Sequence, residues 1–154
     1  MGWLRRTFRV PAGWKGKRLI LHFEAVAGEC QIQVNGAKVG EHFESYIPFE
    51  LDVTAQVKPG MDNELLIGIR HHRLFDKTDA RYPKFRMPYP NGSNTDPLVG
   101  IWQDVSLLAV DPVHVTNTFV KPLVAQDRLE VAVTLANNSS VAQTVSVGGS
   151  VAPW

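Results

Sequence analysis

The sequence predicts an all-β protein built as a β-sandwich, and three observations support this. Apolar and polar residues alternate with a period of two, as in strands that bury one face. No segment keeps a helical period over several turns. Gly, Pro and Asn residues separate the short apolar segments at regular intervals, which is typical of sandwiches with many turns.

The stretch Gln31–Thr54 organises the first part of the chain, and it opens with a predicted hairpin. Asn35-Gly36 favours a type I′ turn, because both central residues of that turn need positive φ. A two-residue turn there pairs Val34 with Ala37 and Ile32 with Val39. The four apolar side chains then share one face, so the turn and the hydrophobic pattern agree on the register.

Alternating residues predict further strands before and after this hairpin, at Leu4–Val10, Arg18–Ala25, Ile47–Val53 and Glu64–Arg70. Pro48 cannot donate a backbone hydrogen bond. The strand that contains it should therefore lie at a sheet edge or begin irregularly. The segment Thr54–Gly60 predicts a single helical turn that ends at Pro59-Gly60.

The segment Gly100–Val110 predicts one more strand, apolar on both faces and buried between layers. Trp102 is large and stands between Ile101 and Val105, so we expect it to be buried. Truncating a buried Trp to Ala typically costs about 3–5 kcal/mol.

The 27 residues His71–Pro97 interrupt this strand pattern. Loops of this length in compact domains are usually functional or disordered, and four aromatic residues argue against simple disorder. The aromatics either pin the loop to the sandwich or face a ligand. Five Lys or Arg against three Asp give a net charge of only +2, too small for a nucleic-acid surface. Adjacent histidines on a strand point to opposite faces, so we predict no metal site from His71, His72, Asp76 and Asp79.

Composition excludes several classes of protein. The formal net charge of +1 gives no general reason for binding nucleic acid or an anionic membrane. The apolar segments are too short to span a bilayer, and no apolar core follows the first arginines as in a signal peptide. The single cysteine, Cys30, excludes an intrachain disulfide and is expected to be a small buried hydrophobe. We expect no cofactor, and the compartment stays open.

Asp111-Pro112 predicts a domain boundary, which gives one domain over residues 1–111 and another over 112–154. The second part holds three strand-like segments, VHVTNTFVKP, RLEVAVTLANNSS and TVSVGG. An immunoglobulin-like sandwich needs around seven strands, so these are about half of one. We expect the chain to be a fragment of a longer, multidomain protein.

Three segments in this order and spacing carry a family resemblance: FRVPAGWKGKRLILHFEAV, VNGAKVGEHFESYIPFELDVT and VGIWQDVSLLAV. They resemble the N-terminal sugar-binding domain of glycoside hydrolase family 2, which includes β-galactosidases, β-glucuronidases and β-mannosidases. The resemblance covers roughly Trp3 to Asp111 and continues weakly into the family's immunoglobulin-like domain. It implies a galactose-binding-like jelly-roll whose first strand precedes Trp3.

The resemblance also implies a function. Retaining glycosidases use two carboxyl groups about 5–5.5 Å apart, and the family carries them on a (β/α)₈ barrel C-terminal to this region. We therefore assign no acid of this chain to catalysis. We expect a non-catalytic domain that binds carbohydrate weakly and helps shape the substrate entrance of that barrel. The alternatives are a free-standing carbohydrate-binding module or lectin, and a purely structural domain.

The candidate substrate-binding residues lie in the long loop. In the family, an Asp or Asn before the glycine-led strand reaches the mouth of the active site, which points to Asp96 and Asn94. Arg81 would bond hydroxyl groups, and Tyr82 or Tyr89 would offer a planar surface to a sugar ring. The alternative for Asn94 and Asp96 is a turn in which their side chains cap the backbone. We also expect the loop to leave and re-enter the sandwich at one end.

Overall fold

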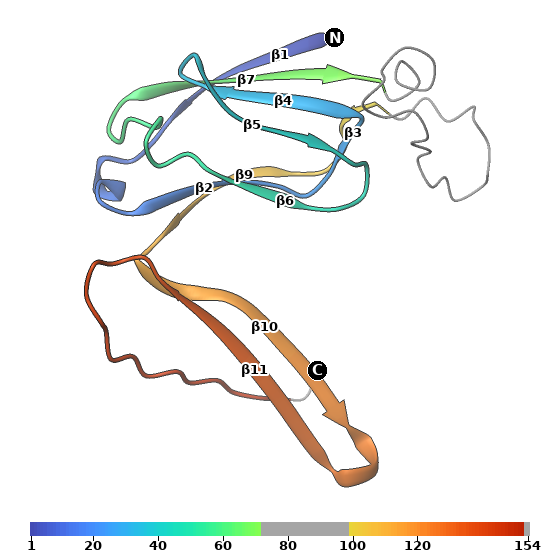
Figure 1. Cartoon of the computed structure of the whole chain (residues 1–154), viewed down its shortest axis with the longest axis vertical. Coiled ribbons are helices and arrows are strands. Elements are labelled where there is room, and N and C mark those ends of the chain that lie inside the picture. Colours follow the sequence, from blue (N-terminus) through green and yellow to red (C-terminus); the bar gives the residue numbers. More distant parts are fainter. Residues whose placement is uncertain (72–98, 153–154) are drawn as a thin grey trace, which may run out of the picture. The chain divides into compact units, whose positions relative to one another are not determined.

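The computed structural model of the chain describes residues 1–71 and 99–152 (Figure 1). The described residues form β-strands and short 3₁₀ helices, and none of their helices is long and apolar enough to cross a membrane. The chain divides into two compact units, Met1–Ala109 and Val110–Trp154. The predicted all-β class is confirmed.

The first unit is a sandwich of two antiparallel sheets, which face each other in Figure 1. One sheet has the strand order β1-β7-β4-β5 and the other β6-β2-β9, while β3 and β8 pair separately. The bounds are β1 (Gly2–Arg9), β2 (Arg18–Phe23), β3 (Val26–Ala27), β4 (Glu29–Val34), β5 (Ala37–Phe43), β6 (Phe49–Asp52), β7 (Asp62–Arg70), β8 (Gly100–Ile101) and β9 (Val105–Val110), with a 3₁₀ turn η1 (Ala12–Trp14).

The core lies between the two sheets. β2 contributes the alternate residues Leu19, Leu21 and Phe23, as the sequence pattern predicted. The facing sheet contributes Ile32 from β4 and Ile67 from β7. These side chains are almost fully removed from water, so they stabilise the sandwich through the hydrophobic effect.

The predicted hairpin is present, with one difference in register. Asn35 has φ 51° and Gly36 has φ 83°, which confirms a turn with two positive φ angles. Val34 pairs with Ala37 as predicted, but a bulge then pairs Ile32 with Gly40 instead of Val39. A Cβ at Gly40 would lie 2.5 Å from Leu51 Cδ2, so the shift places a residue without a side chain where Leu51 packs.

The side chain of Asn35 ties this turn to the rest of the sandwich. Its Nδ2 donates to the Gln56 carbonyl at 2.7 Å and to Asn63 Oδ1 at 2.8 Å. Its Oδ1 accepts a hydrogen bond from the Glu64 backbone N–H at 2.9 Å. The turn is therefore fixed to the start of β7.

The single helical turn predicted over Thr54–Gly60 is also present. The Val57 N–H donates to the Val53 carbonyl, which closes this turn.

The strand predicted over Ile47–Val53 is shorter than expected. β6 begins at Phe49, directly after Pro48, and forms an edge of its sheet. The edge position agrees with the expectation from Pro48, although Pro48 itself lies just before the strand. Ile47 lies outside the strand and is exposed, so the prediction placed the start of this strand too early.

The strand predicted over Gly100–Val110 is broken, and the predicted burial of Trp102 is wrong. β8 pairs with β3, whereas β9 pairs with β2, and residues 102–104 connect them. Trp102 is 40% exposed, and Leu108 on β9 is exposed as well. The chain changes its partner strand here, and Asp104 uses its carbonyl to accept the Glu24 N–H at 3.0 Å. The expected cost of truncating a buried Trp therefore does not apply.

The second unit consists mainly of the hairpin of β10 (Val113–Leu123) and β11 (Arg128–Asn137), joined through η3 (Val124–Gln126). Large apolar side chains along both strands are exposed, including Phe119, Val120, Leu129, Val131, Val133 and Leu135. No strand forms in residues 138–152, so the strand predicted at TVSVGG is wrong. A strand needs a hydrogen-bonded partner, and the described residues offer none to this segment.

Candidate functional site

The predicted site residues lie outside the described part of the chain. All of them fall within residues 72–98: Arg81, Tyr82, Tyr89, Asn94 and Asp96. The same holds for His72, Asp76 and Asp79. Within residues 1–71 and 99–152, no group of three or more His, Cys, Asp or Glu side chains could hold a metal ion. The structure instead shows how the two flanks of this segment are placed.

The two flanks meet at one end of the sandwich. Arg70, the last residue of β7, pairs with Glu29. Gly100, the first residue of β8, pairs with Ala27. Ala27 and Glu29 are separated only by Gly28, so the chain leaves the sandwich and returns to it at the same end. This confirms the expectation that the chain leaves and re-enters the sandwich at one end.

Gly28 allows the close approach of backbones at this end. Its φ is 103°, a conformation that residues with a Cβ rarely adopt. A Cβ on Gly28 would lie 2.5 Å from the carbonyl oxygen of Arg70, which is a steric clash with backbone. Both constraints require glycine at this position.

A mostly buried ion pair fixes the exit of β7. Arg70 Nε donates to Glu29 Oε2 at 2.6 Å, and a terminal guanidinium nitrogen lies 2.5 Å from the same oxygen. The Glu29 side chain is only 6% exposed, and that of Arg70 is 30% exposed. A buried carboxylate needs such a partner, because an unpaired buried charge is strongly destabilising. The sequence pattern did not predict this pair, since only strand register brings the two residues together.

Two aromatic side chains with exposed surface lie at the same end. Trp102 Nε1 donates to the backbone carbonyl of buried Ser45 at 2.8 Å. The Trp102 ring meets the Tyr46 ring edge to face, with centroids 5.8 Å apart and planes at 74°. Tyr46 is 38% and Trp102 is 40% exposed. The sequence analysis did not predict this pair, because it placed Trp102 inside a continuous buried strand. The polar residue Gln103 next to Trp102 was a signal that the strand breaks there.

Two carboxylates of the described residues, Asp52 and Glu41, have partners that fix local structure. Asp52 Oδ2 accepts a hydrogen bond from Arg18 Nε at 2.8 Å, and Asp52 Oδ1 accepts one from the Thr54 hydroxyl at 2.6 Å. Partial burial would raise the pKa of Asp52, but these hydrogen bonds and the Arg18 charge outweigh it and lower the pKa. Glu41 pairs with Lys38 at 2.7 Å. These carboxylates act as anchors for strand ends and strand edges.

A histidine and the cysteine lie side by side across β4 and β5. His42 pairs in register with Cys30 and stacks on Phe49, with ring centroids 3.9 Å apart. Its Nε2 is buried and has no hydrogen-bond partner within the described residues. Burial lowers the pKa of His42, with a smaller opposing effect from Glu44. Burial also raises the pKa of Cys30 to about 12, so this thiol stays protonated and acts as an apolar core residue, as predicted.

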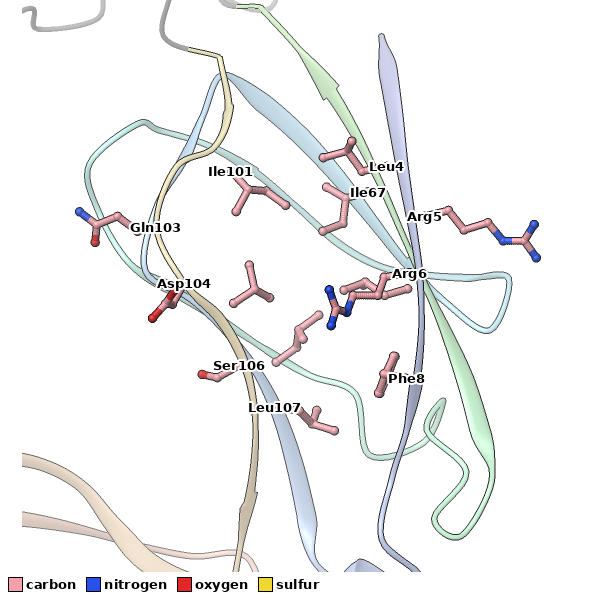
Figure 2. Close-up of a pocket in the computed structure, with 13 residues that line it drawn as sticks. Leu4, Arg5, Arg6, Phe8, Ile67, Ile101, Gln103, Asp104, Ser106 and Leu107 are labelled. Atoms are coloured by element: carbon pink, nitrogen blue, oxygen red, sulfur yellow. The ribbon is translucent and has the colours of Figure 1, made fainter.

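The first unit also has an open groove along one side, between β1 and β9 (Figure 2). Its volume is about 530 Å³. Most of the wall is aliphatic, formed by Leu4, Leu21, Leu65, Ile67, Ile101, Val105 and Leu107. Figure 2 shows the Arg6 side chain on the groove side of β1 and the Arg5 side chain on the outer side. Such walls suit apolar side chains better than the hydroxyl groups of a sugar.

Comparison with known families identifies the class of this protein. The family described as "Glycosyl hydrolases family 2, sugar binding domain" matches residues 1–111. The chain therefore belongs to glycosyl hydrolase family 2, and its first unit is the sugar-binding domain of that family. The β-sandwich agrees with this assignment.

Similar proteins carry two different activity names. A β-galactosidase of Thermoanaerobacter pseudethanolicus is 34% identical over 121 residues, covering 77% of this chain and 15% of that protein. A β-glucuronidase of Formosa agariphila is 28% identical over 114 residues, covering 74% of this chain and 11% of that protein. The β-galactosidase BoGH2A of Bacteroides ovatus is 28% identical over 156 residues, covering 98% of this chain and 16% of that protein. The chain thus spans less than a fifth of each relative.

Solved structures support the fold. A glycosyl hydrolase family 2 member from Bacteroides cellulosilyticus has a TM-score of 0.71 at 26% identity, covering 90% of this chain and 18% of that one. A β-glucuronidase from Ruminococcus gnavus has a TM-score of 0.69 at 18% identity, covering 87% of this chain and 23% of that one. The second likeness concerns the fold alone.

Proposed function

We propose that this chain is the non-catalytic N-terminal sugar-binding part of a longer family 2 glycoside hydrolase. In that enzyme it helps shape the entrance through which a substrate reaches the catalytic centre for hydrolysis of an O-glycosyl bond. The observation that carries the proposal is the family match over residues 1–111 on a β-sandwich whose strands agree with that family. The short span relative to the known enzymes supports the view that catalysis resides elsewhere.

The partners follow from the same proposal. One is carbohydrate, and the other is the catalytic barrel of the longer enzyme. The segment 72–98 is the proposed contact between the two, because its flanks at Arg70 and Gly100 converge beside Gly28. Asp96, Asn94 and Arg81 remain the candidates to bond sugar hydroxyl groups, with Tyr82 or Tyr89 as a surface for the ring. The exposed hairpin β10–β11 is proposed as the start of an immunoglobulin-like domain.

The test is an activity and binding assay on the purified 154-residue chain. We expect no hydrolysis of nitrophenyl β-galactoside, β-glucuronide or β-mannoside, because two suitably spaced catalytic carboxyl groups belong to the barrel. Measurable turnover that a point substitution within the chain abolishes would contradict the proposal.

Calorimetric titration with galactose, glucuronic acid, mannose and their oligomers separates the alternatives. We expect weak binding, because the domain alone supplies few of the polar contacts that a hydroxylated ligand needs. A dissociation constant below roughly 10 µM, or about −7 kcal/mol, would instead indicate a free-standing lectin. A third test uses the longer enzyme with substitutions across the surface of this domain. If its kcat and KM equal those of the unaltered enzyme, the domain has a purely structural role.

A further inference from the structure

We propose that Tyr46 and Trp102 form a binding platform for a neutral pyranose sugar on the body of the sandwich. The proposal rests on the proposed function, since it takes carbohydrate as the ligand class. The site is formed by residues other than those of the segment 72–98. Hereafter the two rings are called the aromatic corner.

The aromatic corner is held in place before any ligand arrives. The Trp102 indole N–H is bonded to the Ser45 carbonyl at 2.8 Å, and Ser45 is 4% exposed. The Tyr46 ring stands at 74° to the indole, so the two rings form adjoining walls. A ring that is already oriented loses little rotamer freedom when a ligand binds.

The two rings do not contribute to the hydrophobic core. Neither belongs to the cluster of buried residues between the sheets or to the partly buried residues that pack on it. Each keeps more than a third of its surface exposed. Two exposed aromatic rings in mutual contact offer a planar surface to a ligand with an apolar face. A pyranose ring has such a face, made of C–H groups, and carries its hydroxyl groups around the rim.

The Glu44 carboxylate next to the aromatic corner favours a neutral sugar over an acidic one. Glu44 precedes Ser45, and its Oε1 already accepts the Ser45 N–H at 2.9 Å. On the other segment, Asp104 stands two positions after Trp102 in the sequence. Carboxylates accept hydrogen bonds from sugar hydroxyl groups and repel the carboxylate of a uronate.

The experiment is an NMR titration of the ¹⁵N-labelled 154-residue chain. The indole N–H signals of its tryptophans are assigned by Trp→Phe substitutions and followed during addition of methyl β-D-galactopyranoside or the methyl β-glycoside of glucuronic acid. We expect a saturable shift of the Trp102 signal with the galactoside, with a dissociation constant of about 1 mM. We expect about tenfold weaker binding of the uronate. The signal of Trp3, which is 47% exposed on β1, should not move.

Two variants and one matched control complete the test. Tyr46→Ala and Trp102→Ala should each abolish the saturable shifts, whereas Trp3→Ala should bind the galactoside as the wild type does. Tyr46→Ala keeps the proposal testable if Trp102→Ala does not give the spectrum of a folded protein. No saturable shift of Trp102, unchanged binding in Tyr46→Ala, or equally tight binding of the uronate would each overturn the proposal.

A parallel assay separates this proposal from the proposed function. If the longer enzyme hydrolyses β-glycosides but the Trp102 signal does not respond, only the aromatic corner is wrong. If the chain binds the galactoside and the longer protein hydrolyses no glycoside, the proposed function is wrong and the platform stands.

Discussion

At the scale of single residues, the pair of Glu29 and Arg70 is the strongest test of how the flanks of segment 72–98 are fixed. Arg70→Ala removes the cation next to a carboxylate that is only 6% exposed. We expect a loss of about 3 kcal/mol in the free energy of unfolding, since removing one partner of a buried ion pair typically costs 3–5 kcal/mol and Arg70 is partly solvated. Urea denaturation of the purified chain measures this loss.

Arg5→Ala is the matched control for this substitution. Arg5 also pairs with a glutamate across neighbouring strands, at 2.5 Å from Glu64 Oε2, but its side chain is 72% exposed. An exposed pair of this kind contributes less than about 1 kcal/mol. Equal losses in both variants would show that the burial of Glu29 is not the cause.

His42 gives the fold a pH dependence with a definite sign. Its pKa is lowered in the folded chain by burial, so the unfolded chain binds the proton more tightly. Stability is therefore complete above the unfolded pKa of about 6.5 and falls as the pH drops through this value toward the lower folded pKa.

The variant His42→Phe should flatten this part of the stability profile. A phenyl ring can keep the stacking on Phe49, which lies 3.9 Å away between ring centroids. Urea midpoints measured between pH 5 and pH 8 provide the comparison. The same loss of stability in wild type and variant over this range would rule His42 out as its source.

At the scale of elements, local chemistry allowed the hairpin to be predicted but not its bulge. Asn35-Gly36 carries its turn preference within two residues, and the φ angles of 51° and 83° agree with it. The shift that places Ile32 opposite Gly40 depends on Leu51, which packs where a Gly40 side chain would be. Leu51 belongs to a different sheet, so a pattern within the hairpin could not indicate the shift.

The break after Ile101 shows the same limit more clearly. Alternation suggested one continuous strand, but the chain pairs first with β3 and then with β2. The contact that orients Trp102 comes from Ser45, 57 positions away in the sequence. The aromatic corner is therefore a product of tertiary structure, and only the polar residues Gln103 and Asp104 within the predicted strand indicated an interruption.

At the scale of the whole molecule, the chain combines a well-packed sandwich with a hairpin whose apolar side chains are exposed. The family and the sandwich could be predicted from three sequence segments, because strand alternation and turn residues are local signals. The role of segment 72–98 could not be predicted from such local signals. Its sequence has no periodicity, and the conformation of such a loop depends on contacts with distant parts of the protein.

The measurement that tests the central claim most directly is the kinetics of the Asp96→Ala variant in the longer enzyme. If segment 72–98 shapes the substrate entrance, we expect kcat/KM to fall about tenfold or more, which corresponds to about 1.4 kcal/mol of transition-state stabilisation. The free energy of unfolding should stay within about 0.5 kcal/mol of the wild type, as expected if Asp96 serves function and not packing. Full activity together with a large loss of stability would show that Asp96 caps a turn, and it would contradict the assignment of this segment to the substrate entrance.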